Sequence, residues 1–442
     1  MNENWANVVA IKILEVSAAL RLRSLWRPVY WGFADQAVIS ASNFLMMLLL
    51  ARNLGPALYG TFVLAYTVLL FTNSIQSALF TQPHNVLGAA RTGEDYRAYT
   101  TVTFISQITF SIIAGVLIAL AASLLMLAGR SYGPLLLAVA AATVTWQIQE
   151  FCRRVFYTQG DYLMAFANDL FTYGGQVIGL LFLWKVGQLT ASLAVLVVAV
   201  ASALGAIVGI LRIWTNLDWT LSRVKSFAII GENWQFGKWL FGSAMASWIS
   251  GQLYPVLTAG FVGVAATGGL RATQNLVAPT HIIVKTFEAV SPPRAARAYR
   301  HGGLAALRAE LLRFGRPLGA LLLLYFTGVS ILADIIVPWL MGEQYRPYAW
   351  LVWVFSITYL LGYGSLMLSV SLRSIGKTAP MFAANMMAAI FALTAGIWLV
   401  RTWGLEGAAV GMAVNSLILF GVLGGALLFF ARSRQQAGMS DT

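Results

Sequence analysis

The sequence predicts an all-α polytopic membrane protein of about 12 transmembrane helices, arranged as two parallel-repeat six-helix bundles. Three observations predict this fold. The 442 residues are 59% hydrophobic and only 10% charged, which is outside the usual composition of soluble domains. Apolar runs of about 20 residues, long enough to cross a bilayer, recur along the chain. Short segments of the first half also recur in the second half.

The apolar runs define the predicted membrane helices, each of which spans about 30 Å at 1.5 Å per residue. Their ranges are 29–52, 58–81, 101–128, 134–157, 162–184, 190–212, 238–261, 265–289, 316–338, 347–371, 380–401 and 406–430. Residues 1–28 are amphipathic and lack a cleavage site, so they predict a cytoplasmic interfacial segment. The remaining parts are a bundle over 29–213, a cytoplasmic connector over 214–237, a bundle over 238–431 and a cytoplasmic tail over 432–442.

The Lys and Arg residues test the number of helices, because they concentrate in cytoplasmic loops. When the amino terminus is placed inside, 23 of the 29 basic residues fall in predicted cytoplasmic segments, five fall outside, and Arg271 lies within a helix. A miscounted helix would invert this pattern downstream. The distribution therefore predicts that both termini are cytoplasmic, and it accounts for the net charge of +13 without a nucleic-acid partner.

The two halves share spaced glycine patterns. One set recurs 208 positions later and the other 217 positions later: Ala51, Gly55 and Gly60 as Ala259, Gly263 and Gly268; Met164, Asn168, Gly179 and Gly187 as Met381, Asn385, Gly396 and Gly404. Six spans, an even number, separate the copies. The halves are therefore predicted to have the same orientation, related by an axis along the membrane normal.

The predicted helix 265–289 carries a polar face within about 140° of its circumference. Tyr66 and Asn73 of helix 58–81 occupy the equivalent positions of its partner. Polar faces in a bilayer turn toward other helices or toward water, so both interhelical hydrogen bonding and a cavity between the halves are open. The length of the row favours a substrate-binding cavity. Its predicted lining is Arg271, Gln274, Asn275, His281, Lys285, Tyr66 and Asn73, with Glu288 at the end of the row.

Three acidic residues, Asp35, Glu150 and Asp169, lie inside predicted spans. A buried carboxylate either pairs with a basic residue or titrates as a coupling site, so Asp35 and Asp169 are candidates for an ion pair or for coupling, with pairing expected for Asp35. Glu150 with Arg153 and Arg154 predicts an interfacial charge cluster. Pro255 and Pro279 each remove a backbone hydrogen bond and predict kinks near the middle of two helices.

Catalytic and metal-binding patterns are not found in the sequence. It has no Walker-type glycine loop, no Gly-x-Ser-x-Gly segment and no soluble domain for a nucleotide, so we expect no enzyme activity and no catalytic residues. The single Cys152 rules out an internal disulfide, and three scattered histidines provide no cluster of metal-ligand spacing. Neither a metal nor another cofactor is therefore expected.

The segment Leu50-Ala-Arg-Asn-Leu-Gly-Pro-Ala-Leu-Tyr-Gly60 resembles the turn between the first two helices of the polysaccharide transporter family, within the multidrug, oligosaccharidyl-lipid and polysaccharide exporter superfamily. The resemblance continues at Glu150 to Asp161, Gly268 to Pro293 and Gly404 to Gly411. It implies two six-helix bundles facing a cationic cavity. Arg271 resembles an arginine in the eighth helix of the related lipid II flippases, whereas their first-helix arginine pair is replaced here by Asp35.

The resemblance also implies a function. We expect an alternating-access flippase that moves lipid-linked O-antigen or exopolysaccharide repeat units from the inner to the outer leaflet of the bacterial inner membrane. The expected partners are a polyprenyl-diphosphate-linked oligosaccharide and membrane lipid, with a glycan polymerase and glycosyltransferases beside them. An inside-negative potential favours outward movement of an anionic head by about 2.3 kcal/mol per charge per 100 mV. The alternatives are a cation-coupled multidrug antiporter of the same superfamily and a non-transporting membrane scaffold for glycan assembly.

Overall fold

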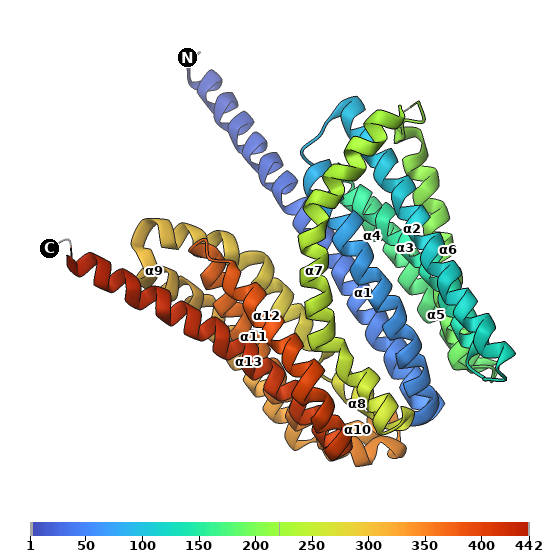
Figure 1. The fold of residues 1–442 in the computed structure, drawn as a ribbon. Coiled ribbons are helices and arrows are strands. Elements are labelled where there is room, and N and C mark those ends of the chain that lie inside the picture. Colours follow the sequence, from blue (N-terminus) through green and yellow to red (C-terminus); the bar gives the residue numbers. More distant parts are fainter. Residues whose placement is uncertain (1–2, 221, 441–442) are drawn as a thin grey trace.

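The computed structural model describes the backbone of residues 3–220 and 222–440, and the side chains of most residues from 30 to 432. Within these residues the chain forms helices and turns and contains no strand. Figure 1 shows two groups of helices that meet at one end, near α8 and α10, and diverge toward the other. The side chains of the predicted amphipathic segment 1–28 lie outside the described residues.

The first group begins with α1 (Glu3–Gln76), which is two helices joined at Gly55, where φ is 72° and ψ is 168°. This conformation is accessible mainly to glycine. The Tyr59 hydroxyl donates a hydrogen bond of 3.7 Å to the Met47 thioether across the turn, so the two segments run antiparallel. Two π-helical turns, Ser77–Thr81 and His84–Gly88, continue the second segment.

The rest of the first group contains α2 (Gly93–Leu127), α3 (Gly133–Gln159), α4 (Tyr162–Asp169), α5 (Gly175–Lys185) and α6 (Ala191–Ile213). A π-helical turn, Leu170–Gly174, joins α4 to α5. The α3 helix packs against both α2 and α6.

The helix α7 (Arg223–Phe261) begins against the first group, where Asn233 bonds with Thr103 of α2, and ends in the second group. The second group also contains α8 (Val264–Asn275), α9 (His281–Ile331), α10 (Ala333–Met341), α11 (Leu351–Ser374), α12 (Ala379–Phe391) and α13 (Ile397–Ser440). A π-helical turn, Ala392–Gly396, joins α12 to α13. The α11 helix packs against both α9 and α13. Two helices are bent by glycines: α9 at Gly302 and Gly303, and α13 at Gly404.

Seven helical segments among the described residues are long and apolar enough to cross a membrane. Two of them, Tyr30–Gly88 with 59 residues and Ala379–Arg432 with 54, are far longer than one crossing requires. Each contains a positive-φ glycine, Gly55 or Gly404, that divides it. These lengths and the apolar surface identify a multi-pass membrane protein, as the composition predicts.

Some helix boundaries differ from those predicted. The α7 helix begins at Arg223, so most of the predicted connector is helical, and the segment between the predicted helices 265–289 and 316–338 is part of α9. The predicted helix 265–289 is divided, because α8 ends at Asn275 and a 3-10 turn, Ala278–Thr280, contains Pro279. Pro279 therefore ends the helical pattern instead of bending it, whereas Pro255 lies inside the continuous α7.

Candidate functional site

The two helix groups meet at a backbone contact between α1 and α8. A Cβ atom added to Gly60 would lie 1.9 Å from the carbonyl oxygen of Val264, and one added to Gly268 would lie 2.0 Å from that of Pro56. Only glycine permits such an approach. Nearby, the Tyr345 hydroxyl donates a hydrogen bond of 3.0 Å to the Ala51 carbonyl. The helix groups are therefore closed against each other at this end.

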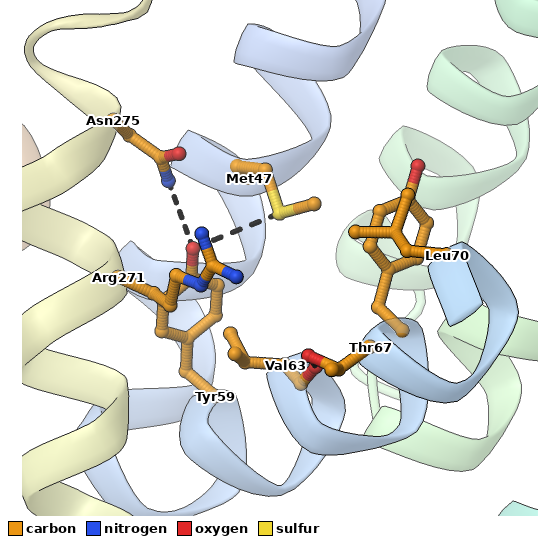
Figure 2. A pocket seen from close by; sticks show the side chains of 8 residues that line it. Met47, Tyr59, Val63, Thr67, Leu70, Arg271 and Asn275 are labelled. Atoms are coloured by element: carbon orange, nitrogen blue, oxygen red, sulfur yellow. Dashed lines mark hydrogen bonds between the residues drawn. The ribbon is translucent and has the colours of Figure 1, made fainter. Parts of the chain in front are cut away.

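A small cavity lies directly beside this contact. It provides about 80 Å³ of space for water-sized groups, and its lining comes from α1 and α8: Met47, Tyr59, Val63, Tyr66, Thr67, Leu70, Arg271 and Asn275. Figure 2 shows the Arg271 side chain extending from α8 toward α1. The described lining thus contains one cationic group, which faces hydroxyl, thioether and aliphatic groups of the opposite helix group.

The Arg271 guanidinium is held by neutral partners. Its Nη1 donates a hydrogen bond of 2.7 Å to Gln274 Oε1, and its Nη2 donates to Gln252 Oε1 of α7. Among the described side chains, no carboxylate lies within ion-pair distance of it. These two bonds use two of the five guanidinium N–H donors. The amide oxygens therefore position the group without cancelling its charge.

A second set of bonds links the two helix groups beside Arg271. The Asn275 amide donates a hydrogen bond of 2.8 Å to the Tyr59 hydroxyl, which is itself bonded to Met47 (Figure 2). The Gln274 amide donates a hydrogen bond of 3.1 Å to the Tyr359 hydroxyl of α11. Side chains of α7, α8 and α11 therefore hold this guanidinium directly or through Gln274, and the Asn275–Tyr59 bond joins α8 to α1 beside it.

The structure brings together part of the predicted lining. Arg271, Asn275 and Tyr66 border the cavity, and Gln274 holds the guanidinium. Asn73 lies two turns beyond Tyr66 and is not part of the lining. The side chains of His281 and Lys285 lie outside the described residues. The prediction that one continuous helix presents them with Arg271 is wrong, because they follow the break at Pro279.

Gln252 and Tyr359 are the functional candidates that the sequence reasoning missed. Gln252 is a polar residue inside the predicted helix 238–261, so the criterion applied to helix 265–289 would have found it. Tyr359 gives no such signal, because tyrosines are frequent in membrane helices and their hydroxyl partners depend on packing.

A separate buried cluster joins α1, α3 and α4 within the first helix group. Arg153 Nη1 lies 2.9 Å from Asp169 Oδ2, and Arg153 Nε lies 3.3 Å from Glu150 Oε2. Arg154 Nη2 lies 2.8 Å from Glu150 Oε1. The predicted Glu150 cluster with both arginines is therefore present, and Asp169 extends it into the protein interior, where it is fully buried.

Asp35 differs from the expectation that it pairs with a basic residue. Its Oδ2 accepts a hydrogen bond from the Tyr157 hydroxyl, its Oδ1 is buried without a hydrogen-bond partner in the described part of the chain, and its carboxyl group interacts with that of Asp169. Tyr157 occupies the place that a cation was predicted to take, because Arg153, one turn earlier on α3, is already engaged by Glu150 and Asp169. One turn of α3 therefore separates Arg153, which pairs with Asp169, from Tyr157, which donates a hydrogen bond to Asp35.

Replacing Arg153 by alanine will strongly destabilise the protein. Glu150 would keep Arg154, but Asp169 would be left buried without a guanidinium, and breaking a buried ion pair costs about 3–5 kcal/mol. Thermal unfolding of the purified protein in detergent measures the effect. Arg212→Ala is the matched control, because the Arg212–Asp161 pair is exposed and 3.6 Å long and is worth about 0–1 kcal/mol. Equal melting temperatures for the two variants would contradict a structural role for Arg153.

Known structures share this fold. The chain is similar to the lipid II flippase MurJ in an inward closed conformation, with a TM-score of 0.69 and 13% identity over 90% of this chain and 87% of that chain. It is also similar to a eukaryotic MATE transporter, with a TM-score of 0.63 and 17% identity over 91% of this chain and 96% of that chain. The fold is therefore that of transporters of the multidrug, oligosaccharidyl-lipid and polysaccharide exporter (MOP) superfamily.

A third similar structure is a MOP superfamily transporter from Pyrococcus furiosus that is described by the reverse polarity of its binding pocket, with a TM-score of 0.55 and 14% identity over 91% of this chain and 96% of that chain. A search of the curated proteins by sequence found no match. Residues 49–350, more than half of the chain, match the model of the family described as "Polysaccharide biosynthesis protein". The resemblance seen in the sequence is thereby confirmed, and the chain belongs to this polysaccharide biosynthesis protein family.

Proposed function

We propose that the chain is a flippase that moves a polyprenyl-diphosphate-linked oligosaccharide, an O-antigen or exopolysaccharide repeat unit, from the inner to the outer leaflet of the bacterial inner membrane. The observation that carries the proposal is the Arg271 guanidinium, which faces a cavity between the two helix groups and, among the described side chains, has only amide oxygens as hydrogen-bond acceptors. A guanidinium fork matches the oxygens of a diphosphate. The family's description and the lipid II flippase fold both support this cargo class.

Alternating access is the proposed mechanism. The Gly60–Gly268 contact supports it, because two glycines have no side chains that interlock at the crossing, so the helices can separate and re-form between two packings. The cavity beside the crossing then receives the diphosphate while the polyprenyl chain stays in lipid. Movement of the two helix groups against each other exposes the head to the opposite leaflet. In the opened carrier the proposed lining extends beyond the closed cavity, and it comprises Arg271, Gln274, Asn275, His281, Lys285, Tyr66 and Asn73, together with Gln252 and Tyr59.

We further propose twelve spans in two parallel six-helix repeats, with bundles over 29–213 and 238–431. Support comes from glycines that the sequence repeat pairs. Gly55 and Gly263 have φ of 72° and 125°, and Gly187 and Gly404 have φ of 71° and 59°. Paired positions thus share a positive φ, which few residues other than glycine adopt. In this arrangement both chain termini are cytoplasmic.

Cysteine labelling tests this orientation. In a variant with Cys152 replaced by serine, we expect an impermeant thiol reagent added to intact cells to label Gln188→Cys, in the proposed outer loop between α5 and α6. It should leave His301→Cys, near the Gly302–Gly303 bend, unlabelled until the cells are broken. Both positions are exposed in the structure, so accessibility within the protein is matched. Labelling of His301→Cys in intact cells would refute the orientation.

Deletion of the protein tests the function directly. We expect finished lipid-linked oligosaccharide to accumulate in the inner leaflet, because synthesis continues while export stops. Extraction and chromatography of the lipid-linked pool, with and without a plasmid-borne copy, measure this. Loss of the repeat units themselves would instead favour a non-transporting scaffold for glycan assembly.

The second candidate function, a cation-coupled antiporter, is favoured by one observation. The cluster of Asp35, Glu150, Asp169, Arg153 and Arg154 contains three carboxyl and two guanidinium groups, so it has a net charge of −1 when all are ionised. Binding one proton or one monovalent cation would neutralise it. The cluster lies within the first helix group, whereas the cavity between the groups contains Arg271, and a cationic cavity disfavours a cationic drug as cargo.

A further inference from the structure

The second helix group carries a concentrated basic surface around the Gly302–Gly303 bend of α9, at the end of the group away from α8 and α10 (Figure 1). We define the α9 basic surface as seven arginines, all exposed, of which six belong to α9 and one to the last turn of α11: Arg294, Arg297, Arg300, Arg308, Arg313, Arg316 and Arg373. The only described acidic residues of α9 are Glu288 and Glu310. The surface is therefore strongly positive, and it is separate from the cavity that contains Arg271.

The bend in α9 gathers these arginines. Gly302 has φ −147° and ψ 21°, and Gly303 has φ 62° and ψ −152°, so the helix is broken into two arms. The arms lie against each other, because the Arg294 guanidinium lies 4.4 Å from the centre of the Phe314 ring. Ala295, Leu307 and Leu311 are buried in the core of the second helix group, together with Val370 of α11. Burial of this apolar side leaves the arginines on the outer side.

These arginines differ in their partners from four arginines of the first helix group. There, Arg91 pairs with Asp95 and Glu232, and Arg153, Arg154 and Arg212 also have acidic partners. Among the described side chains, none of the seven arginines of the α9 basic surface has a carboxylate within ion-pair distance. Enrichment of basic residues in cytoplasmic segments explains their number. It does not explain why α9 carries six arginines but only two described carboxylates.

The place of the surface identifies its ligand. Arg316 is followed five residues later, or about 7.5 Å along the helix, by Leu321, Leu323 and Leu324, which are 50%, 54% and 72% exposed. Arginines therefore border an apolar surface that faces hydrocarbon in a membrane, which is the depth of phospholipid phosphates. Clusters of four to eight basic residues at this position attract anionic headgroups, and each contributes about 1 kcal/mol.

We propose that the α9 basic surface binds the headgroups of anionic phospholipids in the adjoining leaflet and anchors the second helix group to it. Arginine suits this ligand, because its planar fork binds two phosphate oxygens at once. An acidic protein domain is the other class of ligand with the right charge. The border with the lipid-facing leucines favours lipid, since a protein bound there would have to lie across the hydrocarbon edge. This inference does not depend on the cargo.

Binding of a fluorescent phosphatidylglycerol to the purified full-length protein in detergent tests the proposal, with fluorescent phosphatidylcholine as the neutral probe. The test variant is Arg297→Gln/Arg300→Gln/Arg308→Gln. The matched control removes the same three charges from exposed positions of the first helix group and the start of α7, as Arg97→Gln/Arg223→Gln/Lys225→Gln. We expect the test variant to raise the apparent Kd for phosphatidylglycerol at least about tenfold and the control to change it less than about twofold. Size-exclusion profiles verify that both variants are folded.

Three outcomes overturn the proposal. Equal losses in the two triple variants would mean that phosphatidylglycerol responds only to net charge. Equal binding of phosphatidylglycerol and phosphatidylcholine by the unmodified protein would mean that the protein does not distinguish an anionic headgroup from a neutral one. Unchanged phosphatidylglycerol binding by the test variant would leave an acidic protein as the ligand of this surface. The proposal is supported if the affinity of the wild-type protein for phosphatidylglycerol decreases with increasing salt while that of the test variant does not.

Discussion

Replacing Arg271 by alanine is expected to abolish export while the protein still inserts and folds. The guanidinium is the cationic group of the cavity lining, and its described partners are the neutral amides of Gln252 and Gln274. Each hydrogen bond to a charged group contributes about 1.5–3 kcal/mol, so losing a two-pronged contact with a diphosphate removes most of the cargo affinity. Arg271→Lys should retain part of the activity, because an ammonium keeps the charge but not the fork.

Export is measured as surface polysaccharide per folded molecule in a deletion strain complemented with each variant. Arg346→Ala is the matched control, because Arg346 is an exposed arginine paired with Glu343 and lies outside the cavity. We expect normal export from this control. The rival role for Arg271 is to hold helices together. In that case Arg271→Ala would lower the amount of folded protein, and the molecules that do fold would export normally.

Periodicity and composition were sufficient to predict that the chain is helical and membrane-embedded, because repeated apolar runs of about 20 residues are typical of membrane-spanning helices and rare in soluble proteins. The turn at Gly55 was also predictable. It lies in the segment that resembles the family and ends at Gly60, and the same glycine spacing recurs around Gly263 in the second half. The end of α8 was not predictable. A proline such as Pro255 or Pro279 can lie inside a bent helix or can end the helix. The outcome depends on whether neighbouring helices provide hydrogen-bond partners for the backbone groups that the proline leaves unpaired.

The part of the site that lies within one continuous helix was predictable, and the part that depends on contacts between helices was not. Arg271, Gln274 and Asn275 fall within α8, so the angle of 100° per residue placed them correctly on one side. That rule fails across the 3-10 turn that precedes His281. The amide partners of Arg271 could not be assigned in advance either, because Gln252 reaches it from α7 through packing of two helices whose crossing the sequence does not specify.

The partner of Asp35 illustrates the same limit in the first helix group. A buried carboxylate was expected to take a cation, and the sequence offers Arg153 and Arg154 within a turn of each other. Which of the three carboxyl groups receives them depends on the packing of α1 and α4 against α3, and the structure assigns Arg153 to Glu150 and Asp169. Sequence reasoning can identify a set of charges, but the pairing within the set depends on tertiary contacts.

Replacing Gly268 by leucine should open the contact between the helix groups and make the cavity accessible from outside. The added Cβ would lie 2.0 Å from the Pro56 carbonyl oxygen and 3.0 Å from the Gly60 nitrogen. Both are backbone atoms, so α1 and α8 must move apart. Overpacking in a well-packed interior costs about 1–3 kcal/mol, which shifts a two-state equilibrium by roughly 5- to 150-fold.

Accessibility of a cysteine at Thr67, which lines the cavity, measures this shift in a variant with Cys152 replaced by serine. In the proposed orientation, an impermeant thiol reagent outside the cell should label Thr67→Cys slowly when Gly268 is present and at least about fivefold faster with Gly268→Leu. Gly260→Leu is the matched control, because the Cβ position of Gly260 on α7 has no atom within 4 Å in the described part of the chain. Export should fall with Gly268→Leu, since a carrier whose outer side cannot close does not return to load cargo. Unchanged labelling together with normal export would mean that α1 and α8 do not form the outer closure.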